Sequence, residues 1–304
     1  MAIVMMVLLA AHLLCMNISS AAPLLCVWFA DIRCATRSEA DREMAQLLAV
    51  SSIGMLFLGI TLGLANGTIS FLLGDRSLLE TLPHFQRKIF WGILELICSF
   101  VWMLAYSAWL KWRPPRQRIA AFLHGTLAVM SATNLLYHFP PLMSVMSKVA
   151  NGEISVSGDV DAGTFRSLAF TPNVMALTLH FAWASLAVTG MFLFWLARNQ
   201  EPPEKTKYVT LGARVACIAT AFQLPTGLWL LFATPSTTQA RLMGGEPLTA
   251  CLFLGSLIAA FYLLQCLAIL SFGEYDRKLV SRSSWLMITT VFLMSATLHL
   301  LRSQ

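Results

Sequence analysis

Residues 170–200 read FTPNVMALTLHFAWASLAVTGMFLFWLARNQ, and this stretch is an example of the long apolar runs that recur along the chain. No Asp, Glu, Lys or Arg occurs from Asn173 to Ala197, and a basic loop starts at Arg198. The run is far longer than the roughly 9–11 residues of a membrane-spanning strand, and it reaches the length of about 20 residues that a helix needs to cross the hydrocarbon core. The stretch therefore predicts a transmembrane helix.

Seven more apolar runs accompany this one, and the loops between them are short except for 140–172. The eight runs lie near residues 3–29, 45–73, 89–110, 119–139, 173–197, 208–233, 248–272 and 284–301. Of the 304 residues, 57% are hydrophobic and 12% are charged, whereas a soluble domain has about 25% charged residues. The sequence predicts an all-α polytopic transmembrane helix bundle of about eight spans, formed by a single domain over residues 1–304 and surrounded by the lipid bilayer.

The net charge of +6 comes from short loops, so it indicates topology and not binding to nucleic acid. Loops after odd-numbered spans hold thirteen Lys and Arg, and loops after even-numbered spans hold six. The positive-inside tendency therefore places the odd loops in the cytoplasm and both termini outside. The first run has features of a secretory signal, but no Lys or Arg precedes it and apolar residues resume at Leu24. We therefore expect an uncleaved span.

Ionisable side chains inside spans are energetically costly, which makes them the first candidates for function. There are seven: His12, Glu95, His124, His138, His180, Arg214 and His299. Five of them lie in the outer half of the membrane on the topology above, and only His124 and Arg214 lie near the inner face. We expect His124 to be an interfacial histidine and Arg214 to extend toward the headgroups.

The outer histidines suggest haem, because neutral imidazole is a good axial ligand for haem iron in a helix bundle. The seven cysteines contain no CxxC or CxxCH spacing, which argues against c-type haem and against zinc or iron–sulfur centres. Small side chains follow His180 at helical spacing and would leave room for a macrocycle: Ala184, Ala187 and Gly190. The alternative is that this stripe permits close helix packing and that the histidines bond neighbouring carbonyl groups.

Glu95 is expected to be the only acid buried within a span. A carboxylate there would relay protons, ligate a metal or pair with a histidine, and a neutral Glu bonded to a neighbour is the alternative. His124 and His138 are fourteen residues apart and share a helix face, about 21 Å apart along its axis. That spacing would suit two haems stacked across a membrane.

The stretch quoted first resembles the span of cytochrome bd quinol oxidase subunit I that carries the histidine of the low-spin haem b. Pro172, His180 and Ala184 fall on comparable positions of that family's pattern. The run AAHLLCMNISSAAPLL resembles the family's first span, whose histidine ligates an active-site haem, and the matching residue is His12. The run FWGILELICSFVWMLAYSAWLKW is similar to its third span, whose glutamate lies near the haems, and the matching residue is Glu95.

The sequence also departs from the family pattern. Leu257 stands where the family has the methionine that is the second ligand of the low-spin haem, and no GRxPW motif with its haem-ligating glutamate is found. The family's long outer quinol-binding loop corresponds to about a dozen residues around Thr234–Glu246. The resemblance therefore implies fewer than the usual three haem sites, and depth in the membrane suggests His299 or His138 as the partner of His180.

The resemblance implies a b-type haem-binding membrane subunit of a quinol-linked electron-transfer complex, and thus part of an oxidoreductase in the bacterial cytoplasmic membrane. It implies one or more haem b groups with His180 and His12 as iron ligands, and Glu95 as a proton carrier or a partner beside the haems. Quinol or quinone would be the substrate, and another membrane subunit or an outer-face redox protein would be the partner. Two other functions stay open: a haem-free structural or assembly subunit, and a transporter with a polar path of histidines and Glu95.

Overall fold

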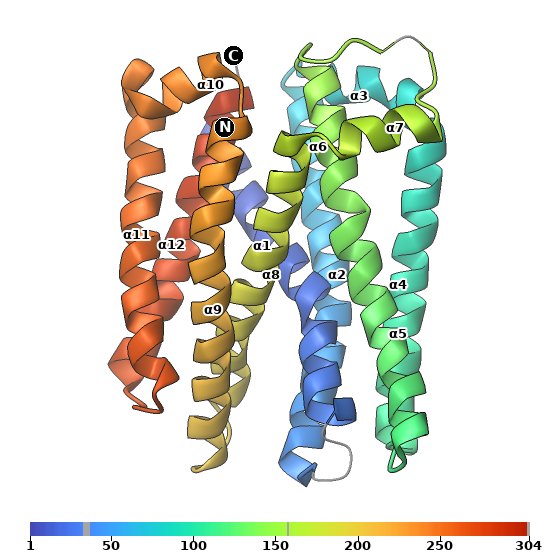
Figure 1. Cartoon of the computed structure of the whole chain (residues 1–304), viewed down its shortest axis with the longest axis vertical. Coiled ribbons are helices and arrows are strands. Elements are labelled where there is room, and N and C mark those ends of the chain that lie inside the picture. Colours follow the sequence, from blue (N-terminus) through green and yellow to red (C-terminus); the bar gives the residue numbers. More distant parts are fainter. Residues whose placement is uncertain (33–36, 157, 303–304) are drawn as a thin grey trace.

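The structure is a computed structural model that describes residues 1–32, 37–156 and 158–302, and these residues form helices joined by short loops (Figure 1). No strand occurs within those ranges. In chain order the elements are α1 (Ala2–Val27), η1 (Trp28–Ile32), α2 (Glu39–Leu72), α3 (Ser77–Thr81), η2 (Leu82–Phe85), α4 (Gln86–Trp112), α5 (Arg118–Tyr137), α6 (Phe139–Ala150), α7 (Ala162–Ala169), α8 (Pro172–Ala197), α9 (Glu204–Ala233), α10 (Ser236–Ala240), η3 (Arg241–Gly245), α11 (Pro247–Ser271) and α12 (Arg277–Arg302).

The described helices form eight spans that are long and apolar enough to cross a membrane, which confirms the predicted number. The spans are α1 with η1, α2, α3 to α4, α5 with α6, α8, α9, α11 and α12. Successive spans run in opposite directions, so both termini lie at one end of the bundle (Figure 1). We call the other end the basic end; its loops are 37–38, 113–117, 198–203 and 272–276. The chain is thus an integral membrane protein with an all-helical fold.

Several helix ends follow from local sequence signals. Ser38 caps α2, because its side chain accepts a hydrogen bond from the backbone N–H of Asp41 at 3.1 Å. Asp161 caps α7 in the same way through the N–H of Thr164 at 2.7 Å, and this bond lowers the pKa of the Asp161 carboxyl. Pro172 and Pro247 occupy the first position of α8 and α11, where the missing N–H costs nothing.

The segment 140–172 is not the loop that the sequence predicts. It contains most of α6 and all of α7, and α6 continues the fourth span beyond α5 (Figure 1). Pro140 and Pro141 lie in the first turn of α6, a position that proline tolerates, so they start a new helix and do not end the span. As a result, His138 lies inside the span between α5 and α6, and not at the outer end of a span as expected.

Small residues bring α8 and α9 very close together. A Cβ atom on Gly190 would lie 2.6 Å from the backbone oxygen of Gly212, and one on Gly212 would lie 2.4 Å from the backbone oxygen of Gly190. Ala187, one turn before Gly190, is also buried. This part of the stripe that follows His180 therefore serves helix packing, and α9 occupies the space that the sequence suggested for a macrocycle.

Helix α1 is central in the bundle, where it contacts α2, α5, α8 and α12. Buried polar groups join it to its neighbours. The Asn17 side-chain oxygen accepts a hydrogen bond from Ser185 of α8 at 2.9 Å, and the Ser52 hydroxyl of α2 donates to the Ser19 carbonyl at 3.0 Å. Such bonds fix the relative depth of neighbouring helices, because each pairs one residue with one partner.

Candidate functional site

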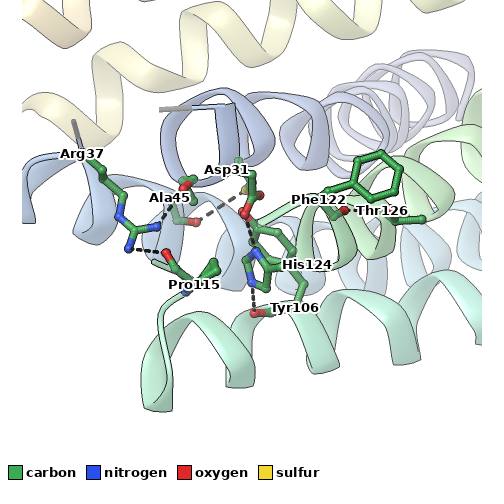
Figure 2. Close-up of polar contacts among 10 residues, drawn as sticks. Asp31, Arg37, Ala45, Tyr106, Pro115, Phe122, His124 and Thr126 are labelled. Carbon is green, nitrogen blue, oxygen red and sulfur yellow. Dashed lines mark hydrogen bonds and ion pairs between the residues drawn. The ribbon is translucent and has the colours of Figure 1, made fainter. Parts of the chain in front are cut away.

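Two groups of ionisable side chains lie within the spans. The first, which we call the Asp31 cluster, lies at the basic end and consists of Asp31, Tyr106 and His124, with Arg37 beside it (Figure 2). The second lies in the opposite half of the bundle and contains the residues that the sequence selects: His12, Glu95, His138, His180 and His299.

His124 is completely buried, and both of its ring nitrogens have partners. Nδ1 lies 2.6 Å from Oδ1 of Asp31, and Nε2 lies 3.0 Å from the backbone oxygen of Tyr106. The Tyr106 ring stacks on the imidazole with centroids 3.9 Å apart, and Trp109 meets it edge-on at 5.3 Å. Hydrogen bonds at both nitrogens and an aromatic ring against its face therefore fix the orientation of this imidazole (Figure 2).

The geometry determines how many protons the cluster binds. A backbone carbonyl can only accept, so Nε2 of His124 carries a proton. Nδ1 and the Asp31 oxygen then share one further proton, which makes the pair either imidazolium with carboxylate or imidazole with carboxylic acid. The geometry thus joins Asp31 and His124 through one short hydrogen bond inside a buried site.

The second Asp31 oxygen accepts a hydrogen bond from the Tyr106 hydroxyl at 3.0 Å. Arg37 donates to two backbone oxygens nearby, to Ala30 at 2.7 Å and to Pro115 at 3.3 Å (Figure 2). Together these bonds join the end of the first span to α4, to α5 and to the loop between them. The Asp31 cluster therefore holds three spans at the basic end.

A local change of helix type carries Asp31 into this cluster. The first span continues beyond Val27 as the π-helix η1, which contains Asp31. π-helical turns are rare and occur frequently at functional sites. The Asp31 side chain is only 4% exposed, so the turn keeps it inside the bundle.

The sequence does not predict the Asp31 cluster. It ends the first span near residue 29 and so places Asp31 in a loop, and it treats His124 as an interfacial histidine. The first expectation is wrong, because η1 extends the span past Asp31. His124 lies at the basic end as expected, but it is fully buried among neighbouring helices. The only signal in the sequence is an acid and a histidine at the basic ends of different spans, and spacing along the chain cannot show that these spans are neighbours.

His12 contacts α2. Its Nδ1 lies 2.7 Å from the Gly59 backbone oxygen, so Nδ1 carries the proton and Nε2 of the neutral ring has a free lone pair. A Cβ atom on Gly63 would lie 2.8 Å from Cε1 of His12, so only glycine fits against this ring. The glycines of α2 therefore create the position that His12 occupies.

Glu95 and His138 form a pair between α4 and the junction of α5 with α6. Oε2 of Glu95 lies 3.0 Å from Nδ1 of His138, and Nε2 of His138 is buried without a hydrogen-bond partner among the described residues. Gly92 faces that nitrogen, because a Cβ atom on Gly92 would lie 3.2 Å from it. The Glu95 side chain is 34% exposed, so it is paired and half-buried. The sequence predicted that Glu95 would be the only acid buried within a span, but Asp31 is also buried within one.

His12 and His180 lie at the same depth but face different helices. Each is five residues before a member of the Asn17–Ser185 hydrogen bond, and α1 and α8 run in the same direction. Five residues correspond to a rotation of about 140° from that contact, and the rings accordingly turn away from it. His12 faces Gly59 and Gly63 of α2, whereas His180 faces Gly227 of α9. The Nδ1 atom of His180 is buried and has no partner among the described residues.

Two remaining residues stay apart from these contacts. His299 is half-buried near the end of α12. Arg214 is exposed, and its Nε donates to the backbone oxygen of Ser271 at the end of α11 at 2.8 Å. Within the described ranges, no group of three or more His, Cys, Asp or Glu is arranged to hold a metal ion. Haem iron needs only one or two axial ligands from the protein, so single histidines are sufficient.

Comparisons with models of known protein families and with curated proteins gave no match to this chain.

Proposed function

We propose that this chain is a b-type haem-binding membrane subunit that passes electrons from quinol to an acceptor, similar to subunit I of cytochrome bd. One observation carries the proposal: His12 and His138 each have Nδ1 at an acceptor, the Gly59 carbonyl at 2.7 Å and the Glu95 carboxylate at 3.0 Å. An acceptor at Nδ1 fixes the proton on that nitrogen and leaves the Nε2 lone pair free. Histidines that bind metals through Nε2 usually have this arrangement.

Unsatisfied nitrogen atoms support the same proposal. Nε2 of His138 and Nδ1 of His180 are buried without partners among the described residues. Leaving such an atom unpaired costs about 1–3 kcal/mol, and an axial bond to iron would remove this cost for a nitrogen that binds it. Haem b, when bound, would supply reversible one-electron oxidation and reduction of its iron. His12 and His180 would serve separate haems, because their rings face different helices.

Glu95 acts as a positioning residue for His138 in this proposal. Its carboxylate holds the Nδ1 proton, which orients the ring and makes Nε2 a stronger donor. The partly exposed carboxylate is also able to exchange a proton, and oxidation of a quinol releases protons together with its electrons. His124 is excluded from ligand roles because both of its nitrogens are engaged, which removes the two-haem reading of His124 and His138.

Haem content per chain tests this proposal. The full-length protein would be purified from haem-replete cells, and haem b would be counted by the pyridine haemochromogen assay. We expect His12→Asn and His138→Asn each to lose one haem per chain, because the Asn amide can still donate to Gly59 or Glu95 but has no Nε2. His84→Asn is the matched control, since Nδ1 of His84 also lies 2.7 Å from a backbone oxygen, that of Gly158, in a surface turn.

A further variant separates positioning from binding. Glu95→Gln keeps an oxygen that accepts from His138 but removes the negative charge, so we expect it to keep haem and to raise the midpoint potential. Full haem retention in both His12→Asn and His138→Asn would contradict the proposal. A wild-type chain without haem would favour a haem-free structural subunit.

A further inference from the structure

Two adjoining hollows lie at the basic end, on the side of the bundle that α8, α9 and α12 form. The first has a volume of about 570 Å³ and lies between the ends of α8, α9 and α12; its cations are Arg198, Lys205 and Arg277. The second is shallow and lies along the first turns of α12; its cations are Arg277, Lys278 and Arg282. The hollows share Arg277 and Ser281, so they form one continuous surface with five cations.

No acidic side chain lies among the residues of the two hollows, although Asp276 caps the first turn of α12 beside them by accepting from the N–H of Lys278 at 2.8 Å. Within the described ranges no ion pair joins any of the five to an acid, whereas Lys207 pairs with Asp41 and Arg42 pairs with Glu39 at the same end of the bundle. A concave surface with one sign of charge attracts a counter-ion. An anion from outside the chain would complement the charge of this surface.

The remaining lining residues indicate what kind of anion fits. Val280 and the exposed rings of Trp195 and Tyr275 give the first hollow an apolar wall, which a free inorganic anion would not need. Trp195 and Trp285 line the two hollows and are 50% and 67% exposed. The Arg198 guanidinium lies 4.2 Å from the centre of the Trp195 ring. Exposed Trp beside Lys and Arg at the ends of spans is typical of the layer where lipid headgroups meet acyl chains.

We propose that this surface binds an anionic phospholipid, with the phosphate at the cations of the two hollows and an acyl chain along the apolar wall. Basic pockets between membrane helices bind such headgroups through the same combination of charge and apolar surface. This surface lies at the basic end beside α8, α9 and α12, whereas Glu95 and His138 lie toward the opposite end of the bundle. The proposal therefore does not depend on haem.

Lipid binding by the purified full-length chain tests the proposal. Native mass spectrometry would measure binding of phosphatidylglycerol, cardiolipin and phosphatidylcholine to the wild type and to two triple variants. The test variant is Arg198→Gln/Lys205→Gln/Arg277→Gln. The control variant removes the same charges from the exposed end of the α4–α5 pair: Lys111→Gln/Arg113→Gln/Arg116→Gln. We expect the test variant to bind the anionic lipids about a hundredfold more weakly, because each cation near a membrane surface contributes about 1 kcal/mol.

The control variant should bind these lipids within about threefold of the wild type. Equal loss in both triple variants would overturn the proposal, because the effect would then be one of overall charge. Equal binding of phosphatidylcholine and phosphatidylglycerol would also overturn it. Inorganic phosphate, added as a competitor, should not displace the lipid at equal concentration; displacement would show that the site recognises free phosphate and not a lipid. Unchanged helix content in circular dichroism would establish that each variant is folded.

Discussion

At His124, both ring nitrogens lie next to oxygen atoms that accept hydrogen bonds, one in the Asp31 side chain and one in the Tyr106 backbone. The ring therefore has no free nitrogen for a ligand. Removing one member of a buried charged pair leaves the other without compensation, and this usually costs about 3–5 kcal/mol. We therefore expect the interaction between Asp31 and His124 to contribute more to stability than either side chain would contribute alone.

We expect Asp31→Ala and His124→Ala each to lower the free energy of unfolding by about 3 kcal/mol. The double variant should lose little more than either single variant, because the partner that would be left uncompensated is gone. Equilibrium unfolding in mixed detergent micelles, followed by circular dichroism, measures these values. Thr126→Val is a control on the same helix, since the Thr126 hydroxyl is exposed and donates only to the Phe122 carbonyl one turn before it. Additive losses in the double variant would contradict a coupled pair.

The sequence could select individual polar residues but not their partners. Ionisable residues inside apolar runs can be recognised in the sequence. The sequence could therefore select His12, Glu95, His138 and His180 as candidates. The bond of His12 to Gly59 depends on the glycines of α2, and the bond of His138 to Glu95 depends on the proximity of α4 and α5. The sequence did not predict that Asp31 lies within the first span, because the pattern of apolar residues does not indicate the π-helical turn η1.

Helices α8 and α9 show how small residues determine packing at the scale of the element. The backbones approach so closely at Gly190 and Gly212 that a methyl group at either position overlaps the opposite backbone. Backbone atoms cannot move aside as a flexible side chain can. The two helices would therefore have to separate along their length to accept a larger residue.

We expect Gly190→Ala and Gly212→Ala each to destabilise the protein by about 1–3 kcal/mol, as overpacking of a close contact does. Gly54→Ala in α2 is the matched control, because a Cβ atom there would have no neighbour within 4 Å. Detergent-based unfolding again provides the measurement. Equal stability of all three variants would show that α8 and α9 do not pack through these glycines.

Span prediction succeeded at this scale because length and apolarity alone determine whether a helix can cross a membrane. The same criterion failed at α6. The pair Pro140–Pro141 has the composition of a helix breaker, yet in the structure it begins a helix that continues the fourth span. The consequence reaches the candidate site, because the longer span encloses His138.

For the whole molecule, the direction of insertion follows from the distribution of charge. The end opposite to the termini carries most of the loop cations, and the positive-inside tendency predicts that it faces the cytoplasm. Alkaline phosphatase fused after Gln304 should then be active in bacterial cells, and the same reporter fused after Gln200 should be inactive. Green fluorescent protein fused at these positions should give the opposite result. The reverse pattern would overturn this orientation.

The central claim is that this helical bundle is a haem protein, and a reduced-minus-oxidised absorption spectrum tests it most directly. The full-length chain would be purified in mild detergent from haem-replete cells, oxidised in air and then reduced with dithionite. We predict difference bands in the α region of b-type haem, with at least one haem b per chain. A flat difference spectrum from folded protein would contradict the claim, and the histidines would then be structural residues of a haem-free membrane subunit.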